Sequence, residues 1–116
     1  MEQIQVLTKR DLSPLQVKEL STLHYKDGFM WSRFINSGNS SIIILAKTET
    51  KILGWGLLSK FSRKNKEFTL DIYVRKDFRR LGIGSKIALA AKQKSKNITV
   101  YRWNTAAKLF FDSVEL

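Results

Sequence analysis

Residues 69–92, TLDIYVRKDFRRLGIGSKIALAAK, hold the pattern that decides which fold we expect. Leu70, Ile72 and Val74 recur at every second position, which predicts a half-buried strand. After Gly84 the apolar residues recur at helical spacing instead, which predicts a helix. The stretch should therefore form a strand, a glycine turn and a helix.

The glycine turn is the chemically informative part of this stretch. Gly82 and Gly84 permit a tight turn and leave no side chain between a ligand and the amides that open the helix. Free amides and the partial positive charge of a helix N-terminus suit a phosphate or pyrophosphate, and Arg79 and Arg80 add fixed charge. The spacing matches neither the three-glycine dinucleotide fingerprint nor the P-loop.

Length and composition limit the other possibilities. The 116 residues are expected to form one domain, residues 1–116. The absence of cysteine excludes thiolate zinc sites and a cysteine nucleophile, and the lone His24 argues against a histidine metal cluster. His24 is a packing residue or a general base, and its place on an apolar helix face favours packing. No secretory leader or apolar run of membrane length is present, so we expect a cytoplasmic protein without a membrane partner.

The net charge of +11 is unevenly distributed. Residues 60–108 contain fourteen Lys and Arg but only Glu67, Asp71 and Asp77 as acidic residues, so this region carries the whole excess. Such a field attracts polyanions, among them nucleic acid and acidic protein surfaces. The loop at residues 59–67, with Lys60, is either a solvated turn or a polyanion contact.

The rest of the chain predicts strands and helices around this centre. Ser13, Pro14 and Gln16 form a capping signature for a helix expected to run to Asp27, with Gly28 just beyond its end. Gly54 and Gly56 within a strand suggest a bulge or a close approach by other backbone. The further elements expected are a strand around residues 4–6, a short helix at 29–36, strands at 42–46, 52–58 and 97–104, and a helix at 105–113.

Two separated motifs resemble the GNAT N-acetyltransferase superfamily. Residues 79–84, RRLGIG, resemble the family's pyrophosphate loop, which has Arg or Gln, two residues, Gly, one residue, and Gly or Ala. Further on, Val100, Asn104, Ala107 and residues 110–111 resemble the family's second motif, in which a strand ending in Val precedes Asn, Ala, an apolar residue and Tyr. Both motifs occur in the family's order and at its distance.

The resemblance implies a fold, a co-substrate and a set of binding residues. The fold is an α/β (α+β) domain with a mixed, mostly antiparallel sheet of about five strands flanked by helices, in the order β-α-(α)-β-β-β-α-β-α. The co-substrate is acetyl-CoA, and the acceptor is an unknown amine, possibly on a protein. The residues implied for acetyl-CoA are Ile72, Tyr73, Val74, Arg79, Arg80, Leu81, Gly82, Ile83, Gly84, Ser85, Asn104, Ala107, Phe110 and Phe111.

The catalytic residues are less well defined by the resemblance. The tyrosine that protonates the departing thiolate in many members falls at Phe111, which has no proton to give. Many members also place a glutamate on the central strand, and the aligned position here is Phe68. The polar candidates nearby are Asp71, Tyr73 and Glu67, with Tyr101 on the following strand.

The end of the chain also differs from the family pattern. The family's next motif would fall at Glu115 and Leu116, so the resemblance implies a short member without the usual C-terminal strands. Its acceptor side would be open unless a second copy, as in a homodimer, or another partner completes it.

Three functions are therefore compatible with the sequence. The first is an acetyl-CoA-dependent N-acyltransferase that acts by direct attack of an amine on the thioester. The second is a non-catalytic acetyl-CoA-binding module that regulates a partner protein, and Phe111 favours it. The third is a small basic nucleic-acid-binding protein.

Overall fold

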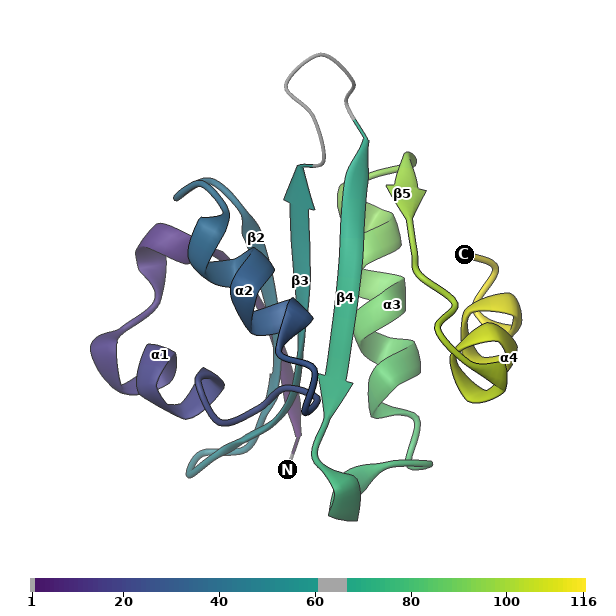
Figure 1. The fold of residues 1–116 in the computed structure, drawn as a ribbon. Helices are drawn as coiled ribbons and strands as arrows, with labels where there is room; N and C mark the ends of the chain where they lie inside the picture. Colours follow the sequence, from purple (N-terminus) through teal and green to yellow (C-terminus); the bar gives the residue numbers. More distant parts are fainter. Residues whose placement is uncertain (1, 61–66) are drawn as a thin grey trace.

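A five-stranded sheet forms the centre of the protein, with its strands in the order β1-β2-β3-β4-β5 (Figure 1). The computed structural model describes residues 2–60 and 67–116. Neighbouring strands from β1 to β4 pair antiparallel, and β4 pairs with β5 in parallel. The expected mixed, mostly antiparallel sheet is confirmed. The strands are β1 (Gln3–Thr8), β2 (Ile42–Lys47), β3 (Ile52–Lys60), β4 (Phe68–Val74) and β5 (Ile98–Thr99).

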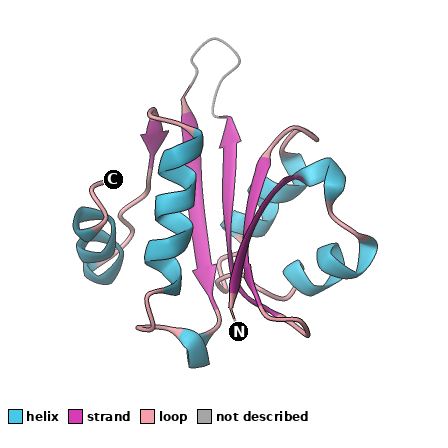
Figure 2. Ribbon diagram, turned by 180° about the vertical axis from the view of Figure 1, so that it is seen from behind, coloured by secondary structure: helices cyan, strands magenta, loops and turns pink. Residues whose placement is uncertain are grey.

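Helices cover both faces of this sheet. Helices α1 and α2 lie on one face and α3 on the other, while α4 lies beside β5 at the edge (Figures 1 and 2). The element order is the one that the resemblance implied. The helices are α1 (Pro14–Leu20), α2 (Phe29–Asn36), α3 (Ile83–Lys94) and α4 (Thr105–Ser113), and short 3-10 helices span Lys9–Asp11 and Lys76–Phe78.

The sheet separates two hydrophobic clusters because alternate side chains of a strand point to opposite faces. Trp55 and Phe34 belong to the cluster under α1 and α2, whereas Leu58 and Ile87 belong to the cluster under α3. The central strands are buried on both sides, as the continuous apolar run in β2 predicted. Both faces of β4 are therefore held in place by packed helices.

Two glycines in β3 allow its neighbours to come close. A Cβ on Gly54 would lie 2.9 Å from the carbonyl oxygen of Tyr73, and one on Gly56 would lie 2.6 Å from Ile87 Cγ2. The expected close approach of backbone is confirmed at Gly54. Opposite it, the register of β2 and β3 shifts between Ala46 and Lys47.

Helix α1 is shorter than the sequence pattern predicted. Its capping box is present, since Gln16 N donates to Ser13 Oγ at 3.1 Å and Ser13 N donates to Gln16 Oε1 at 2.9 Å. The helix nevertheless ends at Leu20 and does not reach Asp27. The prediction of its end was therefore wrong.

Side-chain hydroxyls explain this early end. Ser21 Oγ donates to Lys18 O at 2.5 Å and Thr22 Oγ1 donates to Glu19 O at 2.8 Å, so the last carbonyls are satisfied without another helical turn. Gly28, with a φ of 71°, is the N-cap of α2 instead of a residue that ends α1. The chain between the two helices is thus free to cross the end of the sheet.

The strand predicted at residues 97–104 is also much shorter, because only Ile98 and Thr99 pair with β4. Beyond them, aromatic contacts hold the chain away from β4. Trp103 stacks on Tyr101 with ring centroids 5.3 Å apart and on Phe29 of α2 at 5.7 Å. This departure of the chain opens the space in which the candidate site lies.

Two expectations of the sequence analysis concern a membrane and a polyanionic partner. None of the helices in the described part of the chain is long and apolar enough to cross a membrane. The basic loop predicted at residues 59–67 falls largely on residues 61–66, which lie outside the described residues. A nucleic-acid or acidic-protein partner for the basic region stays a prediction.

Candidate functional site

The site begins where β4 and β5 separate. The two strands pair only at Phe68 with Ile98 and at Thr69 with Thr99, and then diverge toward the lower end of β4 (Figure 1). We call the space between the diverging chains the wedge. It leaves the edge of β4 without a strand neighbour from about Asp71 onward.

The main-chain groups that face the wedge follow from the alternation of a strand. Phe68 N donates to Asn97 O at 2.8 Å on the β5 side, and Arg75 N donates to Leu53 O at 2.8 Å on the β3 side. Ile72 and Val74 therefore direct their main-chain groups to the wedge, whereas Tyr73 directs its own to β3. An extended ligand can pair with the free edge at Ile72 and Val74.

The N-terminus of α3 lies at the open end of the wedge. The turn before it uses two left-handed residues, Arg80 with a φ of 65° and Gly82 with a φ of 82°. In the described residues the main-chain N–H groups from Arg80 to Ser85 donate to no protein acceptor, and the first helical bond runs from Lys86 N to Gly82 O at 3.1 Å. Several free donors and the positive end of a helix dipole thus converge at one place.

Arg79 connects this turn to β4. Its Nε donates to Val74 O at 2.9 Å, and its guanidinium lies 5.5 Å from the ring centre of Tyr25 and 5.4 Å from that of Tyr73. Burial raises the pKa of the Tyr25 phenol, and the charge of Arg79 opposes that rise. The arginine of the motif therefore fixes the geometry of the turn in addition to lining the site.

A cavity of about 580 Å³ joins the wedge to the turn. The residues that line it come from β4, the glycine turn, α2, α4 and the segment after β5. It brings together most of the residues that the sequence had suggested. These are Asp71, Ile72, Val74, Arg79, Arg80, Gly82, Gly84, Ser85, Asn104, Ala107, Phe110 and Phe111.

Four suggested residues lie outside the described lining of the cavity. Leu81 is 64% exposed on the outside of the turn, and Ile83 is buried under α3. Tyr73 lies on the α2 face of β4, with its ring edge-on to Tyr25 at 4.9 Å. Glu67 is exposed, immediately before β4 and at the end of the strand away from the glycine turn.

Asp71 is buried at the centre of the cavity wall, with 8% of its surface exposed. Arg33 of α2 donates from Nε to Asp71 Oδ2 at 2.8 Å and from Nη2 to Oδ1 at 2.5 Å. Asp71 is therefore the buried partner of a residue 38 positions away and is not a solvated side chain. The hydrogen bond to Asp71 raises the pKa of the Arg33 guanidinium above its usual range.

Helix α4 closes the cavity on the side of the glycine turn. Phe111 is its one buried residue in the described structure, and Phe110 packs against Gly84. A Cβ on Gly84 would lie 3.1 Å from the Phe110 ring, whereas one on Gly82 would meet nothing within 4 Å. Gly84 thus lets the Phe110 ring of α4 pack close to the start of α3, and Gly82 is the position that leaves the amides open to a ligand.

The aromatic residues of α2 divide between the core and the cavity. Trp31 and Phe34 stack on each other at 5.0 Å and belong to the core. Phe29 lines the cavity beside Trp103. His24 stacks on Trp31 at 6.1 Å outside the described lining, so it is a packing residue.

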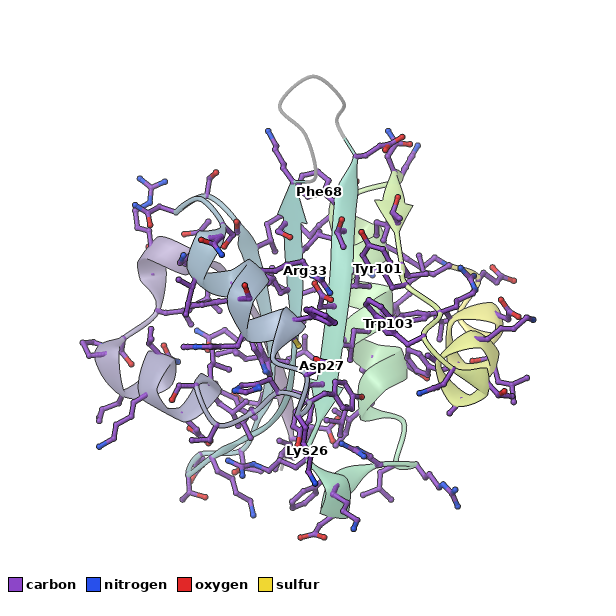
Figure 3. The ribbon with its side chains drawn as sticks, in the orientation of Figure 1. Lys26, Asp27, Arg33, Phe68, Tyr101 and Trp103 are labelled. Atoms are coloured by element: carbon purple, nitrogen blue, oxygen red, sulfur yellow. The ribbon has the colours of Figure 1, made fainter. Side chains whose placement is uncertain are left out.

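Several lining residues were not predicted as site residues, and those of α2 and of the segment before it are distant in sequence from the predicted ones. Figure 3 shows Asp27 and Arg33 on the α2 side of β4, and Tyr101 and Trp103 on the other side. Tyr101 was a polar candidate, but nothing local indicated Arg33, which is 38 residues from Asp71. The residues that sequence reasoning missed are Tyr25, Asp27, Met30, Arg33, Leu70, Phe78, Trp103 and Ala106.

A free strand edge beside an open helix N-terminus offers main-chain groups to an extended ligand and a place for its phosphate groups. Comparison with known families agrees. The model of the acetyltransferase (GNAT) family matches residues 5–114, so the chain belongs to the GNAT acetyltransferase family. No curated protein sequence matches significantly.

Solved structures share this fold at low sequence identity. An aminoglycoside acetyltransferase from an uncultured soil metagenomic sample, in complex with sisomicin, has a TM-score of 0.67 and 19% identity over 99% of this chain and 88% of its own. Glucosamine-6-phosphate N-acetyltransferase from Arabidopsis thaliana has a TM-score of 0.64 and 19% identity over 100% and 91%. Aminoglycoside N-acetyltransferase AAC(6')-Iy in complex with CoA has a TM-score of 0.66 and 11% identity over 97% and 89%.

The residues of this chain fit the family's co-substrate, acetyl-CoA. The free N–H groups from Arg80 to Ser85 are donors without protein acceptors in the described structure, which suits the pyrophosphate. The wedge-facing main-chain groups of Ile72 and the N–H of Val74, whose carbonyl already accepts from Arg79, suit the amide groups of the pantetheine arm. The cavity that connects the two is continuous.

Proposed function

We propose that the protein is an acetyl-CoA-dependent N-acyltransferase that transfers an acetyl group to a small amine by direct attack on the thioester. The wedge carries this proposal, because it places the free edge of β4 between the glycine turn and a cavity that holds a buried carboxylate. Acetyl-CoA supplies the electrophilic carbonyl carbon. The residues of this chain hold it, orient the amine and stabilise charge.

The part of the cavity around Asp71 and Asp27, which we call its acceptor side, suits a protonated amine. Asp71 and Asp27 are the carboxylates of its described lining, and Phe29, Tyr101 and Trp103 add aromatic surface. Aromatic faces and carboxylates both attract cations. We assign Asp71 the role of attracting and orienting the amine, since both of its oxygens already accept hydrogen bonds from Arg33.

In the transfer step, the neutral amine nitrogen forms a bond to the carbonyl carbon, and the C–S bond then breaks. The wedge-facing N–H of Val74 is the donor that we assign to the developing oxyanion. The protonated amine first loses one proton to water in the open cavity, and the nitrogen loses a second proton to water once its bond to the carbonyl carbon has formed. The thiolate takes a proton from water or from a cavity phenol, Tyr101 or Tyr25, because Phe111 cannot supply one.

The compounds for which two structural neighbours are named agree with a hydroxylated amine as the acceptor. One neighbour is an aminoglycoside acetyltransferase bound to sisomicin, and another is named for glucosamine 6-phosphate. We therefore propose amino sugars and related polar amines as the first acceptors to test. Sugar rings also stack well on exposed aromatic side chains such as Trp103, which is 60% exposed.

A second candidate is a non-catalytic acetyl-CoA-binding module that regulates a partner. One observation favours it: Phe111 lines the cavity at the position where the family's general acid is expected. Calorimetric titration with acetyl-CoA and desulfo-CoA, followed by mass spectrometry of amines incubated with the protein, separates the candidates. Binding with acetylated product supports the enzyme, binding without product supports the module, and no binding contradicts both.

A further inference from the structure

Two aromatic side chains join the two walls of the cavity. Phe29, in the first turn of α2, stacks on Trp103, in the segment after β5, with ring centroids 5.7 Å apart and an angle of 16° between the ring planes. Both rings line the cavity, and α2 and Trp103 lie on opposite sides of β4 (Figure 3). We call this pair the clasp. Since Phe29 is two residues from Asp27, the clasp lies at the acceptor side.

The segment that carries Trp103 is held by side chains. Beyond β5 its pairing with β4 ends, and in the described structure no main-chain N–H from Val100 to Trp103 donates to a main-chain acceptor. The stack of Tyr101 on Trp103 and the ion pair of Arg102 with Asp112 hold the segment instead. Segments with few main-chain hydrogen bonds open at a low cost in free energy.

The contact between the two rings is also weaker than the other contact between the same walls. Phe29 is 50% exposed and Trp103 is 60% exposed, so neighbouring side chains do not enclose the stack. Arg33 of α2, which lies over the ring of Tyr101, is in addition fixed by two hydrogen bonds to Asp71. An aromatic stack contributes little compared with a pair of charge-assisted hydrogen bonds. The clasp can therefore open while Arg33 stays in place.

A chain of contacts leads from the clasp to the buried carboxylate. Trp103 stacks on Tyr101 with ring centroids 5.3 Å apart. The ring centre of Tyr101 lies 5.1 Å from the guanidinium of Arg33, which donates to both oxygens of Asp71. A ligand ring that packs on Trp103 thus lies on the wall that ends at this carboxylate. Because a carboxylate attracts an ammonium group, an amine carried by that ring is directed into the acceptor side.

We propose that the clasp opens to admit the acceptor and that Trp103 then holds the ring of the acceptor, so that the protein selects ring-bearing amines over open-chain amines. The incoming ring replaces Phe29 on the face of Trp103, and one stack is thereby exchanged for another. An open-chain amine parts the same two rings without this compensation. This inference rests on the proposed function, which it deepens by naming the class of acceptor and the two residues that select it.

A matched pair of acceptors tests the selection. Glucosamine is compared with glucosaminitol, its reduced open-chain form, which keeps the amine and has no ring. The rates are corrected for the fraction of neutral amine. We expect kcat/KM to favour glucosamine by at least about tenfold. Equal kcat/KM for the two amines would overturn the inference.

Variants of the clasp should change the KM for glucosamine in opposite directions. Phe29→Ala removes the ring that the acceptor displaces, so KM should fall several-fold. Trp103→Ala removes the ring that holds the acceptor, so KM should rise and the preference over glucosaminitol should disappear, whereas Trp103→Phe should retain part of it. Leu109→Ala, at an exposed apolar residue of α4 outside the described lining of the cavity, is the matched control. A KM raised alike by Phe29→Ala and Trp103→Ala would contradict the exchange of rings.

NMR of the wild type separates failure of this inference from failure of the proposed function. In complex with desulfo-CoA, which carries no acetyl group, the protein should show NOEs between the rings of Phe29 and Trp103. Saturating glucosamine should replace them with NOEs between sugar protons and the indole of Trp103. If this exchange occurs and no amine is acetylated, the role of the clasp is supported and the proposed function fails. If amines are acetylated while the NOEs between Phe29 and Trp103 persist, the inference is overturned.

Discussion

Arg33 of α2 and Asp71 of β4 are joined by two hydrogen bonds across the acceptor side of the cavity. The guanidinium of Arg33 also lies 5.1 Å from the ring centre of Tyr101, on the segment after β5. One side chain therefore links three elements that no local sequence pattern connects. The pair fixes both the wall of the cavity and the position of its buried carboxylate.

Removing Arg33 should destabilise the fold. Arg33→Met leaves the carboxylate of Asp71 buried without its cation, and we expect a loss of about 2–4 kcal/mol, below the full value for a buried pair because the Arg33 side chain is 28% exposed. Urea unfolding measures the change. The double variant Arg33→Met with Asp71→Asn should recover part of the loss. Equal stability of Arg33→Met and the wild type would show that the pair contributes nothing.

Substitutions of the two glycines of the turn should impair the protein for different reasons. Gly84→Ala places a methyl group against the Phe110 ring and should lower stability by about 1–3 kcal/mol. Adding Phe110→Leu should restore it, as thermal unfolding can show. If the double variant recovers neither stability nor cooperative unfolding, the packing explanation is contradicted.

Gly82→Val should act mainly on ligand binding. Its φ of 82° disfavours a side chain, and the branched carbons would stand where the free amides meet a pyrophosphate. We expect desulfo-CoA to bind at least tenfold more weakly by calorimetry. Gly28→Val, at a glycine with a similar φ of 71° where a Cβ also meets nothing within 4 Å, is the matched control for backbone strain. An unchanged dissociation constant would remove the pyrophosphate from this turn.

Phe111→Tyr distinguishes the enzyme from the regulatory module. The ring keeps its shape and gains a phenol at the cavity wall, where the resemblance places the family's general acid. A slow acyltransferase should gain turnover, by up to the ~10²–10⁴-fold typical of positioned acid catalysis. Stopped assays of thiol release with an amino sugar measure the gain. Unchanged background turnover with intact acetyl-CoA affinity would favour the module.

The phenol of Tyr25 should lose its proton at a higher pH than an ordinary tyrosine does. Burial raises its pKa above the usual tyrosine range, so the folded protein holds this proton to higher pH than the unfolded chain does. The contribution of Tyr25 to stability is therefore complete below about pH 10 and is lost as pH rises further. Ultraviolet titration of the wild type against Tyr25→Phe isolates this group. If the difference between the two titrations has its midpoint at or below the ordinary tyrosine pKa, the assignment is contradicted.

The sequence by itself determined the elements whose signals are local. Alternation in β4, the glycine turn at position 82 and the capping box of Ser13 and Gln16 each depend on a few neighbouring residues. The glycine turn between β4 and α3 could therefore be predicted from local signals, whereas the order of elements followed from the family resemblance. Where hydroxyls compete for backbone carbonyls, as after Leu20, the same local rules misplaced a helix end.

The tertiary structure alone decided the wedge and the acceptor side of the cavity. The length of β5 depends on whether residues 100–104 pair with β4 or pack elsewhere, and the stacking of Trp103 on Phe29 decides this across more than seventy residues of chain. Likewise, the sequence alone does not decide whether Asp71 faces solvent or a cation. In the folded protein α2 places Arg33 against it. Contacts of this kind arise from packing between distant segments, which leaves no periodic signal in either segment.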